Sequence, residues 1–147
     1  MVEAEGMRIR TGGCQCGDIR YEIHGDPVEA YVCHCRECQK QSSSAFGISV
    51  IVNSSQLRLS SGTPSVWTRP ATIGGSLDCA FCPRCGSRLW HGNPERDDIV
   101  SVKGGSLDTP PDLSAAKHIW TSRKLAGVLI PEHTETHAEE PPSSKAD

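Results

Sequence analysis

Short runs of alternating apolar and polar residues follow one another along most of the chain. Residues 19–23 (Ile-Arg-Tyr-Glu-Ile) alternate with a period of two, which is typical of a half-buried β-strand. Similar short apolar or β-rich runs cover residues 28–32, 46–52, 57–59, 66–68, 77–81, 87–90 and 99–103. A helical period is weak and is confined to about residues 114–125. The pattern therefore predicts an all-β protein made of short strands, with at most short helical turns.

Turn-forming residues separate these runs. Gly25-Asp26-Pro27 marks one turn, and the stretch from Ser60 to Pro64 separates two of the short runs at the spacing of a hairpin. We expect residues 57–59 and 66–68 to pair through this turn. The three tryptophans Trp67, Trp90 and Trp120 are expected inside the core, because the chain has only two tyrosines and two phenylalanines besides them.

The two ends of the chain differ in composition from the middle. With 147 residues the chain is long enough for one domain. We expect a flexible N-terminus at residues 1–8 and one folded domain at residues 9–131. From residue 132 to residue 147 the chain is rich in Glu, His, Thr, Ser and Pro and has almost nothing apolar to bury. This composition predicts a disordered acidic tail.

The charge pattern limits the classes of partner. The formal net charge is −3, and no Lys/Arg cluster supplies the basic surface that phosphate binding requires, so we expect no nucleic-acid partner. Residues 1–6 lack the pattern of a signal peptide, and no apolar run approaches the length needed to span a membrane. We therefore expect a cytoplasmic protein with no membrane partner, and no pattern indicates an oligomeric state.

Eight cysteines are the most distinctive feature of the composition. In a reducing compartment, thiols at CxC and CxxC spacing indicate metal ligands rather than disulfides. They form three groups along the chain, which are Cys14 with Cys16, Cys33 with Cys35 and Cys38, and Cys79 with Cys82 and Cys85. A metal would also help to stabilise a chain that has few large apolar side chains.

Two of the groups share a feature that indicates one common site. Glycine follows both Cys16 and Cys85, and Cys82-Pro83-Arg84-Cys85-Gly86 has the form of a zinc-ribbon turn. One CxC unit and one CxxC unit can close a tetrahedral structural zinc site. We therefore assign Cys14, Cys16, Cys82 and Cys85 to one structural zinc.

The middle group, Cys33, Cys35 and Cys38, then has three thiols and no obvious fourth ligand. Three protein ligands leave a position open for water or substrate, whereas four close the site. Two interpretations of Cys79 stay open at this point: it closes this second site, or it is a thiol packed in a strand. His34, which lies inside the group, is either a neighbour that orients the loop or a residue that faces solvent.

Taken together, the cysteine units and the residues around them resemble a known family. Gly13-Cys14-x-Cys16-Gly17, Cys33-His34-Cys35-x-x-Cys38-Gln39-Lys40, Ser44-Ala45-Phe46-Gly47 and Phe81-Cys82-Pro83-x-Cys85-Gly86-Ser87 are similar to motifs of the glutathione-dependent formaldehyde-activating enzymes, a family that includes centromere protein V. The resemblance extends over about residues 10–130. It also includes segments near residues 102–108 and 118–121, whereas Gly127 stands where many members have a second tryptophan.

The resemblance implies a fold, two cofactors and a site. The fold is a zinc-stapled β-tent of small antiparallel sheets. The cofactors are two zinc ions, one held by the four-cysteine site and one by Cys33, Cys35 and Cys38, with glutathione as co-substrate near the second. Arg36, Lys40, Arg69 and Lys103 are candidates to bind the glutathione carboxylates, and the sequence does not choose among them.

The implied activity is that of a carbon–sulfur lyase of the S-(hydroxymethyl)glutathione synthase type, acting on glutathione and formaldehyde. Cys33, Cys35 and Cys38 would carry the catalysis through their zinc, and the partner would be a small-molecule thiol adduct. Two alternatives stay open. One is a non-catalytic zinc-stapled binding module for glutathione conjugates or a protein partner. The other is a purely structural two-zinc protein in which Cys79 closes the second site.

Overall fold

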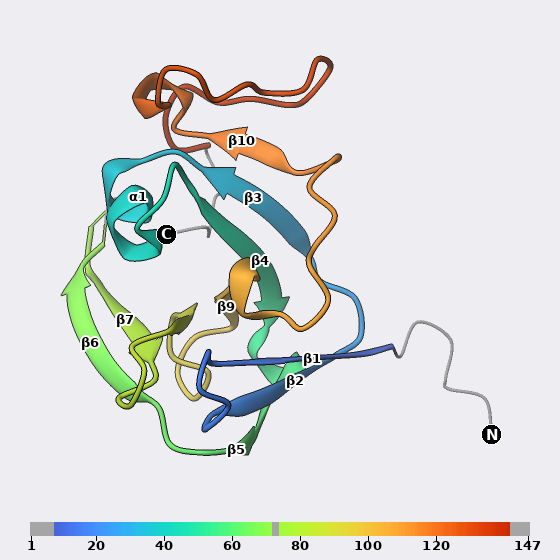
Figure 1. The fold of residues 1–147 in the computed structure, drawn as a ribbon, viewed down its shortest axis with the longest axis vertical. Helices are drawn as coiled ribbons and strands as arrows, with labels where there is room; N and C mark the ends of the chain where they lie inside the picture. Colours follow the sequence, from blue (N-terminus) through green and yellow to red (C-terminus); the bar gives the residue numbers. More distant parts are fainter. Residues whose placement is uncertain (1–7, 72–73, 142–147) are drawn as a thin grey trace.

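The computed structural model of the protein describes residues 8–71 and 74–141 (Figure 1). Within these residues the fold consists of short strands, one short α-helix and three 3-10 turns. The strands are β1 (Ile9–Gly13), β2 (Arg20–His24), β3 (Glu29–Cys33), β4 (Gly47–Asn53), β5 (Leu57–Ser61), β6 (Ser65–Pro70), β7 (Ser76–Phe81), β8 (Arg88–His91), β9 (Ile99–Lys103) and β10 (Lys117–Ile119). The helix is α1 (Arg36–Ser42), and the turns are η1 (Ser54–Gln56), η2 (Gly104–Ser106) and η3 (Thr121–Arg123). The prediction of an all-β protein with short helical turns is confirmed.

The strands form two sheets. The small sheet has the order β1-β2-β5 and is antiparallel. The large sheet has the order β10-β3-β4-β9-β8-β7-β6, and every pair in it is antiparallel except β10 with β3. Figure 1 shows β1 and β2 crossing beside the end of β4, so that one face of each sheet turns toward the other.

The main core lies between these two facing surfaces. Tyr21 and Ile23 on β2 contribute to it, as does Ile19 just before this strand, and the large sheet contributes residues that include Val50, Val52, Leu89, Trp90, Val100 and Val102. Tyr21 meets Trp90 edge to face, with ring centroids 5.9 Å apart. The phenol of Tyr21 is satisfied by the hydroxyl of Ser106 at 2.5 Å. The alternation seen in the sequence thus places one apolar row of each strand in a shared interior.

The predicted hairpin between residues 57–59 and 66–68 is wrong. Both runs are strands, but β5 pairs with β2 in the small sheet, and β6 pairs with β7 in the large one. The turn between them is real, since Gly62 adopts a φ of 82°. The chain therefore uses this turn to pass from one sheet to the other. Trp67 on β6 is also not in the core, because half of its surface is exposed.

Helical structure lies elsewhere than the sequence pattern placed it. The segment at residues 114–125 contains β10 and η3, whereas α1 begins inside the middle cysteine group. This helix buries only Cys38 and Gln39, so it has too little apolar surface to produce a visible helical period. Cys35 is its N-cap, and Ser43 ends it in the left-handed conformation.

The last described segment differs from the expectation of a disordered tail after residue 131. Residues 135–139 run beside β10, and backbone hydrogen bonds join His118 to Glu135 and His137. The indole Nε1 of Trp120 also donates to Glu140 at 2.7 Å. This segment is held by backbone hydrogen bonds to the edge of the sheet. Such bonds do not depend on which side chains are present, so the amino-acid composition could not predict them. Residues 142–147 of the predicted tail, and all but Arg8 of the predicted flexible N-terminus, lie outside the described residues.

The buried position of Leu89 allows a test of the core. Leu89 is fully buried in the main core, whereas Leu129 is 88% exposed. We expect Leu89→Ala to lower the free energy of unfolding by about 2–5 kcal/mol, because it removes buried methyl groups and leaves a cavity. Leu129→Ala should change it by less than about 0.5 kcal/mol. Urea denaturation of both metal-loaded variants checks this, and equal losses would contradict the proposed core.

Candidate metal centres and the adjoining pocket

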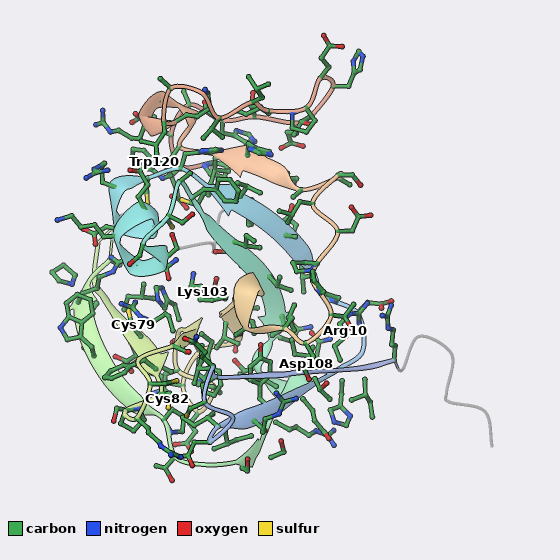
Figure 2. The ribbon with its side chains drawn as sticks, in the orientation of Figure 1. Arg10, Cys79, Cys82, Lys103, Asp108 and Trp120 are labelled. Carbon is green, nitrogen blue, oxygen red and sulfur yellow. The ribbon has the colours of Figure 1, made fainter. Side chains whose placement is uncertain are left out.

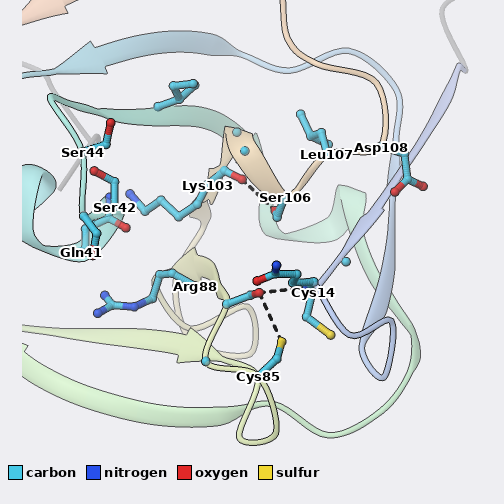
Figure 3. Close-up of a pocket in the computed structure, with 18 of the residues that line it drawn as sticks. Cys14, Gln41, Ser42, Ser44, Cys85, Arg88, Lys103, Ser106, Leu107 and Asp108 are labelled. Atoms are coloured by element: carbon cyan, nitrogen blue, oxygen red, sulfur yellow. Dashed lines mark hydrogen bonds between the residues drawn. The ribbon is translucent and has the colours of Figure 1, made fainter.

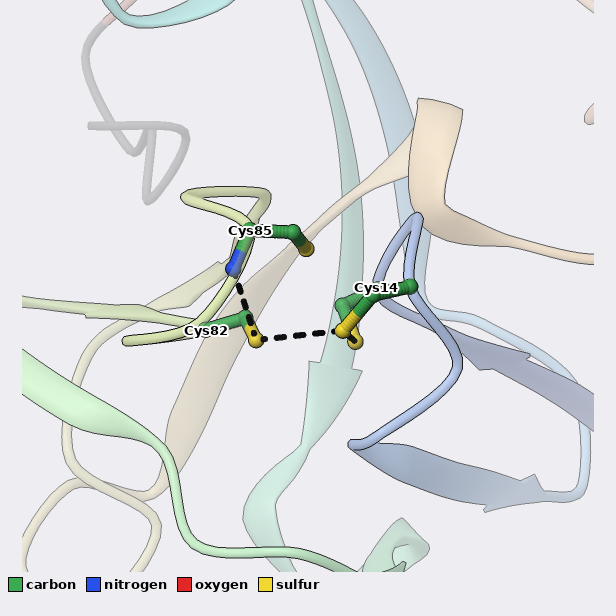
Figure 4. Close-up of side chains that lie close together, drawn as sticks. Cys14, Cys82 and Cys85 are labelled. Carbon is green, nitrogen blue, oxygen red and sulfur yellow. Dashed lines mark hydrogen bonds between the residues drawn. The ribbon is translucent and has the colours of Figure 1, made fainter.

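The first thiol group joins two turns that are distant in the sequence. Cys14 and Cys16 lie between β1 and β2, and Cys82 and Cys85 lie between β7 and β8. Their four sulfur atoms all lie within 4.8 Å of one another. Figure 4 shows Cys82 and Cys85 facing Cys14 across the space between the two turns. This group therefore connects the small sheet to the large one.

Local backbone geometry supports negative charge on these sulfurs. The amide of Ile19 donates to Cys14 Sγ at 3.2 Å, and the amides of Arg84 and Cys85 each lie 3.4 Å from Cys82 Sγ. The turns that present these amides contain Gly17 and Gly86, whose φ angles are 83° and 84°. Such positive angles favour glycine, which is the physical reason for a glycine after each final thiol.

The spacing of the sulfurs fits a tetrahedral metal. Four sulfur atoms bound to zinc at about 2.3 Å would lie about 3.8 Å from one another. The distance from Cys14 Sγ to Cys16 Sγ is 3.6 Å, and that from Cys16 Sγ to Cys82 Sγ is 3.8 Å. The Ser87 hydroxyl, 3.3 Å from Cys85 Sγ, is the main cause that lowers the pKa of Cys85 to about 5. The group can therefore hold a thiophilic metal ion.

The second thiol group is local and more deeply buried. Cys33 ends β3, Cys35 caps α1, and Cys38 lies in the first turn of α1. Their sulfur atoms lie within 4.8 Å of one another, and each residue is at most 6% exposed. The amide of Cys38 donates to Cys35 Sγ at 3.3 Å. The three thiols pack with Tyr31, Ile51 and Ile119 in a second, smaller core.

Electrostatics within this second group favour a bound cation. The neighbouring thiols Cys33 and Cys38 lower the pKa of Cys35, whereas Cys35 and Cys38, together with burial, raise the pKa of Cys33. One buried negative charge thus opposes the formation of the next, as expected for like charges in close contact. A metal cation among the sulfurs removes this conflict, since it allows all three to be thiolates.

Neither Cys79 nor His34 joins the group. Cys79 is fully buried in β7, where its thiol contacts the carbonyl of Leu77, and it belongs to neither thiol group. His34 is also fully buried, which excludes a solvent-facing position, but its Nε2 bonds Nδ1 of His118 at 2.9 Å. Among the residues described, three sulfurs are thus the whole donor set found at this position.

His34 and His118 connect the thiol loop to β10. Their rings stack with centroids 5.1 Å apart, and the amide of His34 donates to the carbonyl of Ile119. Gln39 adds two further bonds, from its Nε2 to the carbonyls of His34 and Arg123. Sequence reasoning did not find this pairing, because the two histidines are 84 positions apart and only the parallel contact of β10 with β3 brings them together.

A pocket of about 910 Å³ is lined in part by the four-thiol group (Figure 3). Cys14 and Cys85 line it from the four-thiol side, and Phe46 and Ile48 line it beside the three-thiol side. Gly47 lies between these last two, and a Cβ placed there would lie 3.4 Å from Cys38 Sγ. Of the cations expected to meet a carboxylate, Lys103 lines this pocket, whereas Arg36 and Lys40 are exposed on α1.

Comparison with known sequences decides the family. A sequence model of the glutathione-dependent formaldehyde-activating enzymes matches residues 9–123, a range that contains every thiol of both groups. The chain belongs to this family. Its members are named for glutathione-dependent activation of formaldehyde, and the two thiol groups fit the metal-binding character that the motifs predicted.

A solved structure has a similar fold. The crystal structure of a Rhodobacter sphaeroides protein, a structural genomics target, matches with a TM-score of 0.56 and 21% sequence identity. The alignment covers 74% of this chain and 98% of that one. At this level of identity the likeness supports the fold alone. Among the residues described here, no helix is long and apolar enough to cross a membrane.

Metal analysis can test the division of the thiols. We expect Cys82→Ala to lose about one bound metal ion per chain, because it removes one of four converging sulfurs. Cys79→Ala, which removes a thiol outside both groups, should keep the wild-type metal content. Inductively coupled plasma mass spectrometry of the purified proteins measures both. Loss of a metal ion from the Cys79 variant, with retention by the Cys82 variant, would contradict the division.

Proposed function

We propose that this protein catalyses the addition of the glutathione thiol to formaldehyde, which gives S-(hydroxymethyl)glutathione, and the reverse carbon–sulfur cleavage. The observation that carries the proposal is the group formed by Cys33, Cys35 and Cys38. Three buried sulfurs converge there, and neither Cys79 nor His34 completes a set of four. A three-ligand site is the arrangement that zinc enzymes use when substrate takes the remaining position.

Two zinc ions would have different roles in this account. Cys14, Cys16, Cys82 and Cys85 would hold a structural ion, because four thiols complete a tetrahedron. Cys33, Cys35 and Cys38 would hold the second. A zinc ion there supplies Lewis acidity that lowers the pKa of a coordinated thiol or polarises a carbonyl oxygen.

The reaction itself needs no further cofactor. The sulfur of glutathione forms a bond to the carbonyl carbon of formaldehyde, and the carbon–oxygen π bond breaks. The proton lost by the thiol is balanced by one gained at the new alkoxide oxygen, so no oxidant or reductant is involved. The reverse step breaks the carbon–sulfur bond and releases both reactants.

Hydrogen bonds and burial fix the positions of the three thiols and limit their contact with water. Cys33 is fixed by the pairing of β3 with β4, and Cys35 is fixed as the cap of α1. Gln39 donates a hydrogen bond to the carbonyl of His34, and the stacked pair of His34 and His118 connects this loop to β10. Burial of the sulfurs limits competing water, which strengthens electrostatic interactions inside the site.

The pocket provides a route for the substrate. Phe46 and Ile48 line it on either side of Gly47, and the absence of a side chain at Gly47 leaves room for the side chains of Gln41 and Cys38. Gln41 and Ser42, from the last turn of α1, line the same wall. A peptide thiol in the pocket would therefore lie beside the strand whose Gly47 neighbours Cys38.

A second candidate is a binding module for glutathione conjugates without turnover. The donor set favours it, because three thiolates donate strongly to a metal and weaken its acidity. Both functions use the same residues. A measured reaction rate therefore distinguishes the enzyme from the binding module, whereas a binding affinity for the conjugate does not. A modest acceleration of an already facile addition is the expected extent of catalysis.

Exchange NMR on glutathione and formaldehyde tests the enzyme. We expect wild-type protein to accelerate exchange between free formaldehyde and the adduct above the rate in buffer. Cys35→Ala should return it to the buffer rate, because two sulfurs no longer hold the second metal. Cys79→Ala should keep the wild-type rate. Identical exchange in buffer, in wild type and in the Cys35 variant would eliminate catalysis and leave the binding module.

A further inference from the structure

The last described segment of the chain is joined to β10 and to the turn that follows it. Figure 1 shows this segment in red beside β10, at one edge of the large sheet. Among the described residues, five backbone hydrogen bonds of 2.9–3.3 Å join residues 135–139 to residues 118–122. The family match ends at residue 123, so the segment lies beyond the matched range. We use the name strap for residues 135–140.

Side-chain hydrogen bonds add to this contact at the end of the strap. The indole Nε1 of Trp120 donates to Glu140 at 2.7 Å, and Ser122 Oγ donates to Glu139 at 3.2 Å. Trp120 is half-buried and packs against the core that contains the three thiols. Figure 2 shows Trp120 between the strap and α1. The strap therefore binds a residue that itself contacts the three-thiol core.

β10 extends this contact to the loop that carries the thiols. In the parallel pair of β10 with β3, Ile119 lies opposite Cys33. The next residue of the loop, His34, donates its amide hydrogen to the carbonyl of Ile119 at 3.0 Å. Its ring Nε2 lies 2.9 Å from Nδ1 of His118, and both rings are buried. Backbone and side chain thus both hold the thiol loop against β10.

His118 is the residue that joins the strap to this loop. Its backbone amide donates to the carbonyl of Glu135 at 3.0 Å, and its carbonyl accepts from the amide of His137 at 2.9 Å. Its ring meanwhile stacks on the ring of His34. Among the described residues, the hydrogen bonds of the strap to other elements lead to β10 and η3, and none leads to the turns of the four-thiol group.

A metal site with three protein ligands depends strongly on the groups that hold those ligands in place. If one thiol moves, such a site keeps only two protein donors, whereas a four-thiol site keeps three. Residues that orient metal ligands without binding the metal typically change its affinity by about 10- to 100-fold when they are replaced. His34 lies between two of the three thiols, so its contact with His118 belongs to this class of interaction.

We propose that the strap positions the three-thiol group through His118 and thereby slows the loss of the metal ion from that group alone. His118 and the backbone of the strap are positioning residues, because they act through His34 and touch neither metal nor substrate. The proposal rests on the second zinc of the proposed function. It adds that a segment beyond the family match controls how firmly this zinc is held, while the four-thiol site is independent of it.

The rate of zinc release to the coloured chelator 4-(2-pyridylazo)resorcinol tests the proposal on the zinc-loaded full chain. Cys35→Ala, which keeps only the four-thiol zinc, identifies the release phase of that ion. His137→Pro removes the amide hydrogen that His118 accepts, and we expect it to release the three-thiol zinc about five- to tenfold faster. His137→Ala keeps this amide and loses only an ion pair with Glu135 that is partly exposed, so it should release both ions as wild type does.

Two variants of His118 test the link between the strap and the thiol loop. His118→Leu cannot form a hydrogen bond to His34, and we expect it to release the three-thiol zinc about tenfold faster. His118→Asn keeps a polar atom near the position of Nδ1 and should restore most of the wild-type retention. In both variants the four-thiol zinc should leave at the wild-type rate. A general loss of stability would speed both ions equally, and that result would overturn the proposal.

The outcomes also separate this inference from the proposed function. Wild-type release of both ions by His137→Pro and His118→Leu, in a protein that accelerates formaldehyde exchange, would remove the strap's role and leave the enzyme standing. Selective release of the three-thiol zinc by these variants, in a protein whose wild type does not accelerate exchange, would support the strap and eliminate the enzyme.

Discussion

The convergence of four cysteine sulfurs is the constraint on which the rest of the structure depends. Cys16 and Cys82 are 66 positions apart, yet their sulfurs lie 3.8 Å from each other. Backbone amides already turn toward Cys14 and Cys82, so the protein is prepared for thiolate charge at this point. A metal clip across so long a loop restricts the unfolded chain strongly. It also fixes the small sheet against the large one, and the main core lies between them.

The three-thiol group lies on the sheet that the four-thiol group fixes in place, but the two groups differ in three respects. It is local in sequence, it is buried in a second core, and it has one sulfur fewer. Cys14 lines the pocket, and so do Phe46 and Ile48, which flank Gly47, a neighbour of Cys38. Lys103, the last residue of β9, lines the pocket, and β9 pairs with β4, which carries Gly47. The strands that form the main core therefore also carry residues of the proposed site.

Much of this arrangement could be predicted from the sequence. The short strands follow from alternation, and the thiol grouping follows from spacing and from the glycines after Cys16 and Cys85. That β5 pairs with β2 and β6 with β7 could not be predicted, because turn residues indicate that the chain reverses but not which sheet it enters next. α1 is too short and polar for a periodic signal, and residues 135–139 are held by backbone bonds that composition does not encode.

The site around the thiols was predictable only in part for a similar reason. The sequence offers several cations and no means of choosing, whereas strand register brings Arg69, His91 and Lys103 to one face. The pairing of His34 with His118 likewise depends on a parallel contact between β3 and β10. Cysteine spacing in the sequence identifies metal ligands that are close to one another in the chain. The side chains around these ligands depend on which strands pair.

Zinc X-ray absorption spectroscopy tests the central claim most directly, namely that one site is closed and the other open. Protein with both sites filled should show an average of about 3.5 sulfur ligands per zinc, from one site with four and one with three. Glutathione should raise this average toward about 4 as its sulfur takes the open position. An average of 4 before any glutathione is added, unchanged afterwards, would contradict the account.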